Sequence, residues 1–456
     1  MATTQPYRPD PKILELGGGF YDPVKAADFP QAIPRFLNHR AAAEVGLAGT
    51  DWEAHFARFE PLPNNLPQPL ALRYHGHQFR HYNPDLGDGR GFLFAQLRDA
   101  PSSKHTLGRL MDLGTKGSGQ TPWSRRGDGR LTLKGGVREV LATEMLEALG
   151  VETSRSFALF ETGEALVRGD EPSPTRSAVL TRLSHGHIRI GNFQRLAFLG
   201  DVEGLRALTA YVLEHLYDEP ADAGPERLLE LVCDRTATLA ASYITAGFVH
   251  GVLNSDNINV TGESFDYGPW RWAPTWDEGF TAAYFDENGL YAFGRQPEAI
   301  QWDVAQLGGC LALIGDGPAP GALLADWPRR FEPALIAALL RRLGISASTE
   351  PEDRALVSAL LAALRGRTVG IDRLFFDWRG GRDPGDDGFP ELRANLDGRQ
   401  NSPTHAYWSD PAPCSMLIEE VEAIWAAIAT RDDWQPFEAK VAAIRRMGEA
   451  FLADAA

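Results

Sequence analysis

The chain is poor in cysteine. It contains three cysteines among 456 residues, Cys233, Cys310 and Cys414, which lie far apart in the sequence. None belongs to a Cys-x-x-Cys pair, and the nearby histidines His75, His77 and His81 match no standard zinc spacing. The sequence therefore indicates neither a disulfide framework nor a zinc site.

Long apolar runs and an excess of basic residues are also missing. No stretch of about 18 apolar residues occurs, so no membrane span is expected. The first residues lack a basic region followed by an apolar stretch, so no secretory signal is expected. The formal net charge is −16, which argues against a nucleic-acid partner because such proteins usually present a basic face. We therefore expect a cytoplasmic protein that binds neither membranes nor nucleic acids.

Two signatures of common catalysts are absent as well. The chain has no Gly-x-Ser-x-Gly elbow and no Walker-type Gly-x4-Gly-Lys-[Ser/Thr], which excludes the usual serine hydrolase and P-loop classes. The hydrophobic content of 43% and the charged content of 23% are ordinary for a globular protein with a sizeable core. The length suggests two or three structural units.

Hydrophobic periodicity predicts an α+β protein whose two halves differ. Strands are predicted at 92–97, 110–115, 156–161, 164–168 and 178–182, and helices near 41–59 and at 137–148, 228–243, 417–428 and 437–451. Gly150 stands where a left-handed cap would end the helix at 137–148. The sheet-forming segments thus precede most of the helical ones.

This order predicts two lobes, a small one with a sheet and a larger helical one. We expect residues 1–70 to form an N-terminal extension packed on the body. Residues 71–185 would form the sheet-bearing lobe, and residues 186–456 the helical lobe with the catalytic loop and the C-terminal helices. A cleft between the lobes would be the natural ligand site.

The most informative stretch runs from His250 to Asn257, His-Gly-Val-Leu-Asn-Ser-Asp-Asn, with Asp266 ten positions after Asp256. One carboxylate can orient a hydroxyl nucleophile. An amide oxygen and a second carboxylate are hard ligands for a magnesium ion that also binds phosphate oxygens. The stretch therefore indicates an enzyme that handles a nucleoside triphosphate.

A lysine and a glutamate extend this interpretation. Lys116 ends a predicted strand and enters a glycine-rich turn, and Glu139 follows 23 positions later in the predicted helix. Kinase-like folds hold their phosphate-binding lysine by such a pair. The alternative for Lys116 alone is a solvated lysine at a sheet edge, and the presence of Glu139 favours the phosphate ligand.

Three further segments are candidate phosphate contacts. Gly87-Asp-Gly-Arg-Gly91 would let the backbone approach phosphates closely, although an ordinary hairpin turn is the more frequent explanation of such a segment. Asp128-Gly129-Arg130 also fits a surface turn. Arg182 and Arg189 flank the predicted lobe junction and would clamp phosphate oxygens, with structural salt bridges as the alternative.

Taken together, these segments resemble the selenoprotein O family of protein nucleotidyltransferases, which have a protein-kinase-like fold. The matching stretches run in family order across roughly residues 70–310. They are Tyr74-His-Gly-His-Gln-Phe79, Leu86-Gly-Asp-Gly-Arg90, Lys116-Gly-Ser-Gly-Gln-Thr-Pro-Trp-Ser-Arg125, Asp128-Gly-Arg130, Arg138-Glu139, Thr181-Arg182, His250-Gly-Val-Leu-Asn-Ser-Asp-Asn257, Asp266-Tyr-Gly-Pro269 and Tyr291-Ala-Phe-Gly-Arg-Gln-Pro297.

The resemblance implies a specific reaction and specific roles. ATP would bind in a flipped orientation, so that AMP passes to Ser, Thr or Tyr hydroxyls of proteins, the chain itself included. Asp256 would accept the proton, Asn257 and Asp266 would bind magnesium or manganese, and Glu139 would pair with Lys116. The implied nucleotide contacts are Gly87, Gly89, Arg90, Lys116, Asp128, Gly129, Arg182, Arg189 and Asp266.

The chain departs from the family in two places. Some members carry a redox pair near the C-terminus, whereas here Cys414 is followed by Ser-Met-Leu417 and then 39 residues without cysteine. Redox gating is therefore not expected. Residues after about 320 also match the family poorly, which predicts a different mode of target recognition.

Three alternatives to AMP transfer remain. UMP transfer from UTP with manganese is known in the family. A conventional kinase-like phosphotransferase needs the same lysine, asparagine and aspartate. A non-catalytic pseudokinase scaffold would bind nucleotide alone, but the intact set Asp256, Asn257 and Asp266 argues against it.

Overall fold

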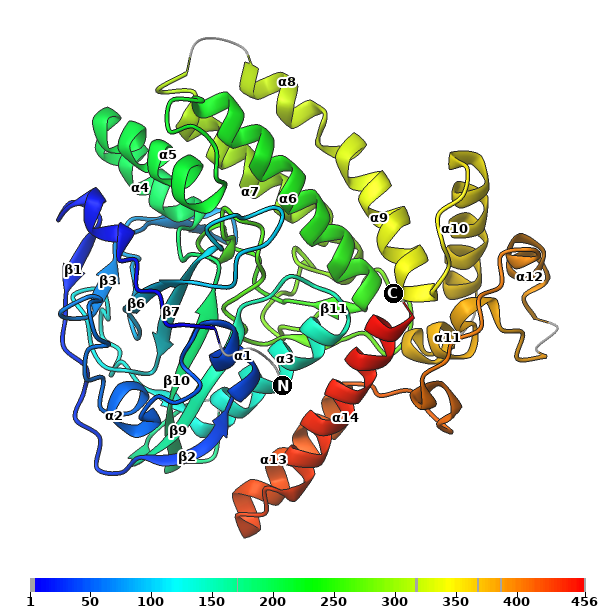
Figure 1. The fold of residues 1–456 in the computed structure, drawn as a ribbon, viewed down its shortest axis with the longest axis horizontal. Helices are drawn as coiled ribbons and strands as arrows, with labels where there is room; N and C mark the ends of the chain where they lie inside the picture. Colours follow the sequence, from blue (N-terminus) through cyan, green and yellow to red (C-terminus); the bar gives the residue numbers. More distant parts are fainter. Residues whose placement is uncertain (1–4, 170, 316–318, 367–368, 386–387, 455–456) are drawn as a thin grey trace.

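An antiparallel sheet of eight strands is the centre of the first half of the chain (Figure 1). The computed structural model describes residues 5–169, 171–315, 319–366, 369–385 and 388–454. The strands lie in the order β1, β3, β6, β7, β10, β9, β2, and β8 pairs with β10. They are β1 (Tyr21–Pro23), β2 (Ile33–Leu37), β3 (Leu70–Leu72), β6 (Leu93–Arg98), β7 (Leu110–Lys116), β8 (Leu131–Thr132), β9 (Arg155–Leu166) and β10 (Thr175–Ser184).

Two short hairpins and many helices complete the described residues, so the expected combination of a sheet and many helices is confirmed. The hairpin strands are β4 (Gly76–Gln78) with β5 (His81–Asn83), and β11 (Phe248–Val249) with β12 (Arg271–Trp272). The α-helices are α1 (His39–Glu44), α2 (Trp52–Phe56), α3 (Leu133–Ala148), α4 (Ile190–Leu199), α5 (Val202–Leu216), α6 (Pro225–Ala246), α7 (Gln296–Leu311), α8 (Ala319–Ala325), α9 (Trp327–Leu343), α10 (Glu350–Arg365), α11 (Ile371–Asp377), α12 (Pro390–Leu396), α13 (Ile418–Arg431) and α14 (Gln435–Ala453). Short 3₁₀ turns are η1 (Lys12–Leu16), η2 (Ser255–Asn257), η3 (Phe293–Arg295), η4 (Arg379–Gly381) and η5 (Ala406–Ser409).

Two strands that were predicted separately are one strand in the structure. The stretches at 156–161 and 164–168 are parts of a single strand, β9. Gly163 has φ of +79°, and the pairing register with β10 shifts near this point. The glycine therefore marks a bulge inside a strand rather than a turn between two strands.

The helical segment predicted near 41–59 is divided. It forms α1 and α2, and Gly46, with φ of +75°, lies between them. Asn38 and Asp51 cap the two helices by accepting the backbone N–H of Ala41 and Ala54. Each cap starts a new helix, so the segment is broken by its own capping residues.

Side-chain alternation buries both faces of the sheet. Leu93 of β6 belongs to the hydrophobic cluster that contains α3. Phe94 of β6 and Phe92, the residue before the strand, belong to the cluster on the other face. Phe56 and Phe59 from the N-terminal segment pack edge-on against these phenylalanines. The first 70 residues thus cover one face of the sheet, and they also supply both of its edge strands.

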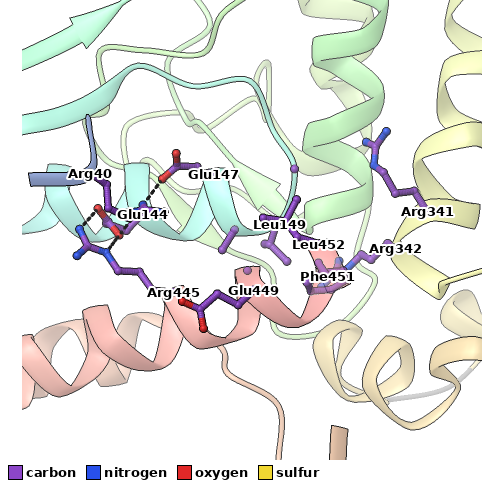
Figure 2. Close-up of a pocket in the computed structure, with 13 residues that line it drawn as sticks. Arg40, Glu144, Glu147, Leu149, Arg341, Arg342, Arg445, Glu449, Phe451 and Leu452 are labelled. Atoms are coloured by element: carbon purple, nitrogen blue, oxygen red, sulfur yellow. Dashed lines mark hydrogen bonds and ion pairs between the residues drawn. The ribbon is translucent and has the colours of Figure 1, made fainter. Parts of the chain in front are cut away.

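Helix α3 crosses the other face and carries Glu139. Thr132 caps its N-terminus by accepting the N–H of Gly135, and Gly150 follows its end with φ of +78°. Helix α14, from the far end of the chain, lies beside α3, and Arg445 forms an ion pair with Glu144 at 2.7 Å (Figure 2). A cavity of about 350 Å³ lies at this joint. The C-terminal helix therefore supports the helix that holds Glu139.

The helices of the second half pack mainly on one another. Helix α6 contacts α7 and α9, and α10 to α12 share a separate hydrophobic cluster with α9 (Figure 1). Among the described residues, none of these helices has the length and apolar character needed to cross a bilayer.

Glu263 gives a prediction about stability. Its buried carboxyl group accepts the backbone N–H of His185 at 3.0 Å, and burial raises its pKa to about 8. In the unfolded state the pKa of this carboxyl returns to about 4.3. Between about pH 4.3 and pH 8, Glu263 is therefore protonated in the native state and ionised in the unfolded state. Rising pH thus lowers the free energy of unfolding between these two values. Glu263→Gln keeps an acceptor and carries no charge, so we expect it to be more stable than wild type by roughly 4 to 5 kcal/mol at pH 8.

Thermal unfolding at several pH values checks this prediction. The gain in Tm should grow from pH 5 to pH 8. Glu214→Gln, at an exposed position on α5, is the control. A gain that does not change with pH would show that the Glu263 carboxyl is not the group that titrates.

Candidate functional site

A cavity of about 790 Å³ gathers most of the residues that the sequence singled out. Eight basic and four acidic side chains line it, although the whole chain carries a net charge of −16. The predicted residues along its wall are Gly87, Gly89, Arg90, Lys116, Asp128, Gly129, Arg182, Arg189, Asp256, Asn257 and Asp266. This local excess of positive charge suits an anionic ligand such as a polyphosphate.

Two glycine-rich segments form one wall of the cavity. The side chains of Thr121 and Ser124 donate to the carbonyls of Asp88 and Gly89, each at 2.5 Å. A Cβ at Gly87 would lie 2.4 Å from the Trp123 ring, so this contact requires glycine. The turn at 87–91 and the segment after Lys116 are therefore locked together, and their glycines serve this close packing.

The second glycine-rich turn places Asp128 at the mouth of the cavity. Gly129 has φ of +70°, and its carbonyl accepts the N–H of Gly119 at 3.1 Å. Asp128 is exposed and forms an ion pair with Arg168 at 2.8 Å, while Arg130 pairs with Glu164. Arg130 and Arg168 line the cavity together with Asp128.

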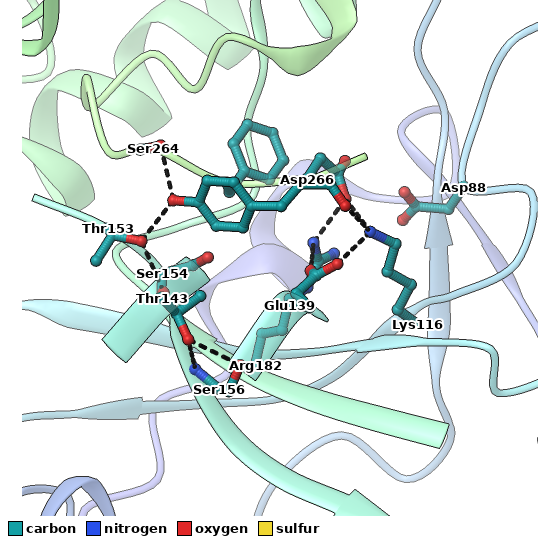
Figure 3. Close-up of polar contacts among 12 residues, drawn as sticks. Asp88, Lys116, Glu139, Thr143, Thr153, Ser154, Ser156, Arg182, Ser264 and Asp266 are labelled. Carbon is teal, nitrogen blue, oxygen red and sulfur yellow. Dashed lines mark hydrogen bonds and ion pairs between the residues drawn. The ribbon is translucent and has the colours of Figure 1, made fainter. Parts of the chain in front are cut away.

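Lys116 and Glu139 form a buried ion pair (Figure 3). Lys116 Nζ lies 2.5 Å from Glu139 Oε2 and 3.9 Å from Asp266, and it also donates to the Tyr267 carbonyl at 3.3 Å. Glu139 is fully buried. Burial lowers the pKa of Lys116, and Glu139 opposes that shift. The lysine that ends β7 is thus held at the cavity by the helix that crosses the sheet.

Asp266 lies between three cations. Its two oxygens accept from Arg182 at 2.6 Å and from Arg189 at 2.7 Å, with Lys116 nearby. Burial opposes its ionisation, but these cations hold its pKa well below the usual range. Asp266 has φ of +60°, a conformation that few non-glycine residues adopt and that recurs at functional sites. It remains a carboxylate at every physiological pH.

Arg189 connects Asp266 with the catalytic-loop candidate. Its guanidinium donates to the main-chain carbonyl of Asp256 at 3.0 Å and to Asp88 at 3.2 Å. It also lies over the ring of Tyr74, 4.4 Å from the centroid. Since this arginine is buried, its contacts fix the relative positions of three acidic residues.

Asp256 differs from Asp266 in having no cationic partner. It lies in η2 and is 7% exposed, and its Oδ1 has no hydrogen-bond partner among the described residues. Burial raises its pKa to about 7. A buried carboxyl without a partner is costly, and such groups are frequent at functional sites. Its pKa lies in the range of an efficient general base.

The oxygen atoms beside Asp256 fit a hard divalent cation. Asn257 donates its Nδ2–H to the carbonyl of Val252 at 3.0 Å, which leaves Oδ1 as its remaining polar atom. Each Asp266 oxygen retains a second lone pair beyond its arginine bond. The described residues contain no cluster of three or more His, Cys, Asp or Glu suited to a metal. One amide and one carboxylate nevertheless suffice for magnesium, which is commonly completed by substrate phosphates and water.

The sequence analysis missed several residues of this cavity. Asp88 and Tyr74 contact Arg189, and Arg125 and Arg126 line the cavity near Asp256. Asp88 lies between Gly87 and Gly89, so its position in the motif could have identified it. The two arginines occur in a polar segment that reads as an ordinary surface turn.

Hydrogen bonds of the Tyr267 side chain fix the backbone beside Asp266. Its hydroxyl donates to Ser264 at 2.7 Å and shares a hydrogen bond with Thr153 at 2.5 Å (Figure 3). Because the Tyr267 carbonyl accepts from Lys116, these bonds fix the backbone next to Asp266. Among the predicted residues, Glu139 is the one that does not line the cavity and acts through its ion pair.

The sequence is similar to characterised families over most of its length. The family model described as "Protein adenylyltransferase SelO" matches residues 4–385. A "Protein nucleotidyltransferase YdiU" of Synechocystis sp. is 40% identical over 94% of this chain and 96% of the relative. The proteins of that name from Gloeobacter violaceus and Rhodopseudomonas palustris are 42% and 35% identical, over 96% and 91% of this chain and 95% and 89% of those relatives. The similarity extends past residue 320, beyond which a poor match was expected, because the family model reaches residue 385.

Proposed function

The chain belongs to the family of the protein adenylyltransferase SelO and is an enzyme of that family, and we propose that it transfers AMP from ATP to Ser, Thr or Tyr hydroxyls of proteins. The observation that carries the proposal is the buried carboxyl of Asp256, whose Oδ1 has no hydrogen-bond partner among the described residues, at a cavity lined by eight basic side chains. Because the members of this family are described as transferases, the alternative of a non-catalytic nucleotide-binding scaffold is not supported.

In this proposal Asp256 is the general base. The acceptor oxygen forms a bond to the α-phosphorus, the bond from that phosphorus to the β-phosphate oxygen breaks, and pyrophosphate leaves. The hydroxyl proton passes to Asp256. The lack of a cationic partner keeps this carboxylate basic, whereas the cations around Asp266 keep that carboxylate ionised and unable to accept a proton at neutral pH.

The basic residues of the cavity bind the phosphates. Lys116, Arg182 and Arg189 lie within hydrogen-bond or ion-pair distance of Asp266 and carry the charge that a triphosphate requires. Gly87, Gly89, Arg90, Asp128 and Gly129 would form the wall along the nucleotide. Asn257 and Asp266 would hold magnesium or manganese, which supplies neutralisation of phosphate charge when bound.

We also propose the protein-kinase-like arrangement of two lobes. Residues 71–185 would be the N-terminal lobe, residues 186–456 the helical lobe, and residues 1–70 the packed extension. The support is a lysine at the end of a sheet strand paired with a helix glutamate, as kinase folds require. In this proposal ATP binds in the flipped orientation that the family resemblance implies, which would place the α-phosphate, not the γ-phosphate, next to Asp256.

ATP labelled at the α- or the γ-phosphate tests the proposal. We expect the purified chain, incubated with magnesium and a protein acceptor, to give stable label on protein from α-labelled ATP only. Label from γ-labelled ATP alone would replace the proposal with a phosphotransferase. α-Labelled UTP with manganese, run in parallel, measures UMP transfer by the same site.

A further inference from the structure

The β4–β5 hairpin, residues 76–83, lies against the loop that carries Asp256. Its strands pair Gly76 with Asn83 and Gln78 with His81. This is the segment whose histidines form no metal-binding pattern in the sequence. The hairpin contacts η2 and α4, and it is not part of the main sheet.

The hairpin main chain is bonded to the two residues that precede Asp256. The N–H of His77 donates to Ser255 Oγ at 2.7 Å, and the N–H of Phe79 donates to Asn254 Oδ1 at 3.0 Å. The hydroxyl of Tyr291 also donates to Asn254 Oδ1, at 2.8 Å. Both acceptor side chains are buried, so these bonds lie away from water.

Gln194 of α4 completes a closed ring of hydrogen bonds with His77 and Ser255. The Ser255 hydroxyl donates to Gln194 Oε1 at 2.6 Å, and Gln194 Nε2 donates to His77 Nδ1 at 2.6 Å. Ser255 is completely buried and Gln194 is 4% exposed. Hairpin, loop and helix α4 are therefore joined by three hydrogen bonds that begin and end on His77. This explains the histidine without a metal.

Gly76 brings the hairpin into direct contact with Asp256. A Cβ at this position would lie 2.9 Å from both Cβ and Oδ1 of Asp256. Its φ is outside the left-handed region, so glycine is required here by the close approach and not by backbone conformation. A side chain at residue 76 would have to move Asp256 itself, because Asp256 Cβ is rigidly attached to the backbone.

We propose that the β4–β5 hairpin is the positioning element of Asp256, with Gly76, Ser255 and Gln194 as positioning residues. It acts by removing the conformational freedom of a short 3₁₀ turn that carries the base. The catalytic consequence rests on the proposed function of Asp256 as proton acceptor, but the fixing of the loop does not.

Two variants test the proposal with matched controls. Gly76→Ala adds volume against Asp256, and Ser255→Ala removes the hydroxyl that joins the hairpin to Gln194. Gly309→Ala adds a methyl group in open space on α7. Ser154→Ala removes an equally buried hydroxyl that has no hydrogen-bond partner among the described residues.

We expect both test variants to lower kcat for AMP transfer by about tenfold or more, since displacement of a reacting group by about 1 Å can cost about 100-fold. The KM for ATP should change by less than about twofold, because the phosphate-binding side chains are untouched. Amide hydrogen exchange in residues 253–258 should become about tenfold faster, and both controls should match wild type.

Wild-type exchange rates at 253–258 in both variants would overturn the proposal. So would a KM for ATP that rises as much as kcat falls, because that is the result of a general structural defect. If wild type transfers no AMP, the proposed function fails, while the exchange measurement still decides the role of the hairpin. If Gly76→Ala does not fold, Ser255→Ala and its control decide it.

Discussion

Asp256→Ala is expected to reduce AMP transfer by about three orders of magnitude, the typical range for loss of a general base. ATP binding should stay within about threefold of wild type, because Lys116, Arg182 and Arg189 keep their contacts with Asp266. Stability should not fall, because the lost carboxyl has an orphaned buried oxygen whose burial is unfavourable.

Label transfer from α-labelled ATP and calorimetric titration with ATP measure the two effects separately. Asp256→Asn should be as inactive as the alanine variant, since an amide keeps the shape but cannot accept the proton. Asp222→Asn, an exposed residue, is the control. Transfer at the wild-type rate by either Asp256 variant would assign the base to another group.

Lys116→Met is expected to lower kcat/KM for ATP by at least about 100-fold. An ammonium about 3 Å from a phosphate oxygen contributes on the order of 5 kcal/mol at an effective dielectric near 20, and part of this is lost again by desolvation. Methionine retains the volume of the stem, so the packing of β7 is preserved. The main effect should appear as weaker binding of nucleotide.

The same substitution should also destabilise the fold. Glu139 would lose its partner at 2.5 Å and keep only Arg182 at 3.3 Å. Removing one partner of a buried ion pair typically costs about 3 kcal/mol. Adding Glu139→Leu to Lys116→Met should restore much of the Tm without restoring activity, while Lys25→Met, at an exposed position, should change neither. Full activity of Lys116→Met would remove this lysine from the phosphate site.

Local sequence patterns predicted the central strands and the long helices well. Strands β6, β7 and β10 and helices α3, α6, α13 and α14 lie where periodicity placed them, because their residues are buried with a regular repeat. The edge strands β1 and β2 were not predicted. They are three and five residues long, too short for a period to appear, and they become strands only by pairing with β3 and β9.

The sequence predicted most of the residues that line the candidate cavity, but not their electrostatic environments. The sequence alone determined the residue types: an Asp-Asn loop, a glutamate in a helix after a strand lysine, and glycines with arginines between them. The hydrophobic periodicity of helices and strands also predicted which of these residues lie in the same helix or strand. It could not show that Asp256 and Asp266, ten positions apart, have opposite electrostatic environments.

The tertiary structure decided that difference. Arg182 and Arg189 come from β10 and the start of α4, and both bind Asp266, whereas Asp256 is covered by Gly76 of a distant hairpin. The free energy of ionisation depends on burial and on neighbouring charge, and both are set by contacts between segments far apart in the chain. One aspartate is therefore a permanent anion, and the other is a carboxyl that is able to take up a proton.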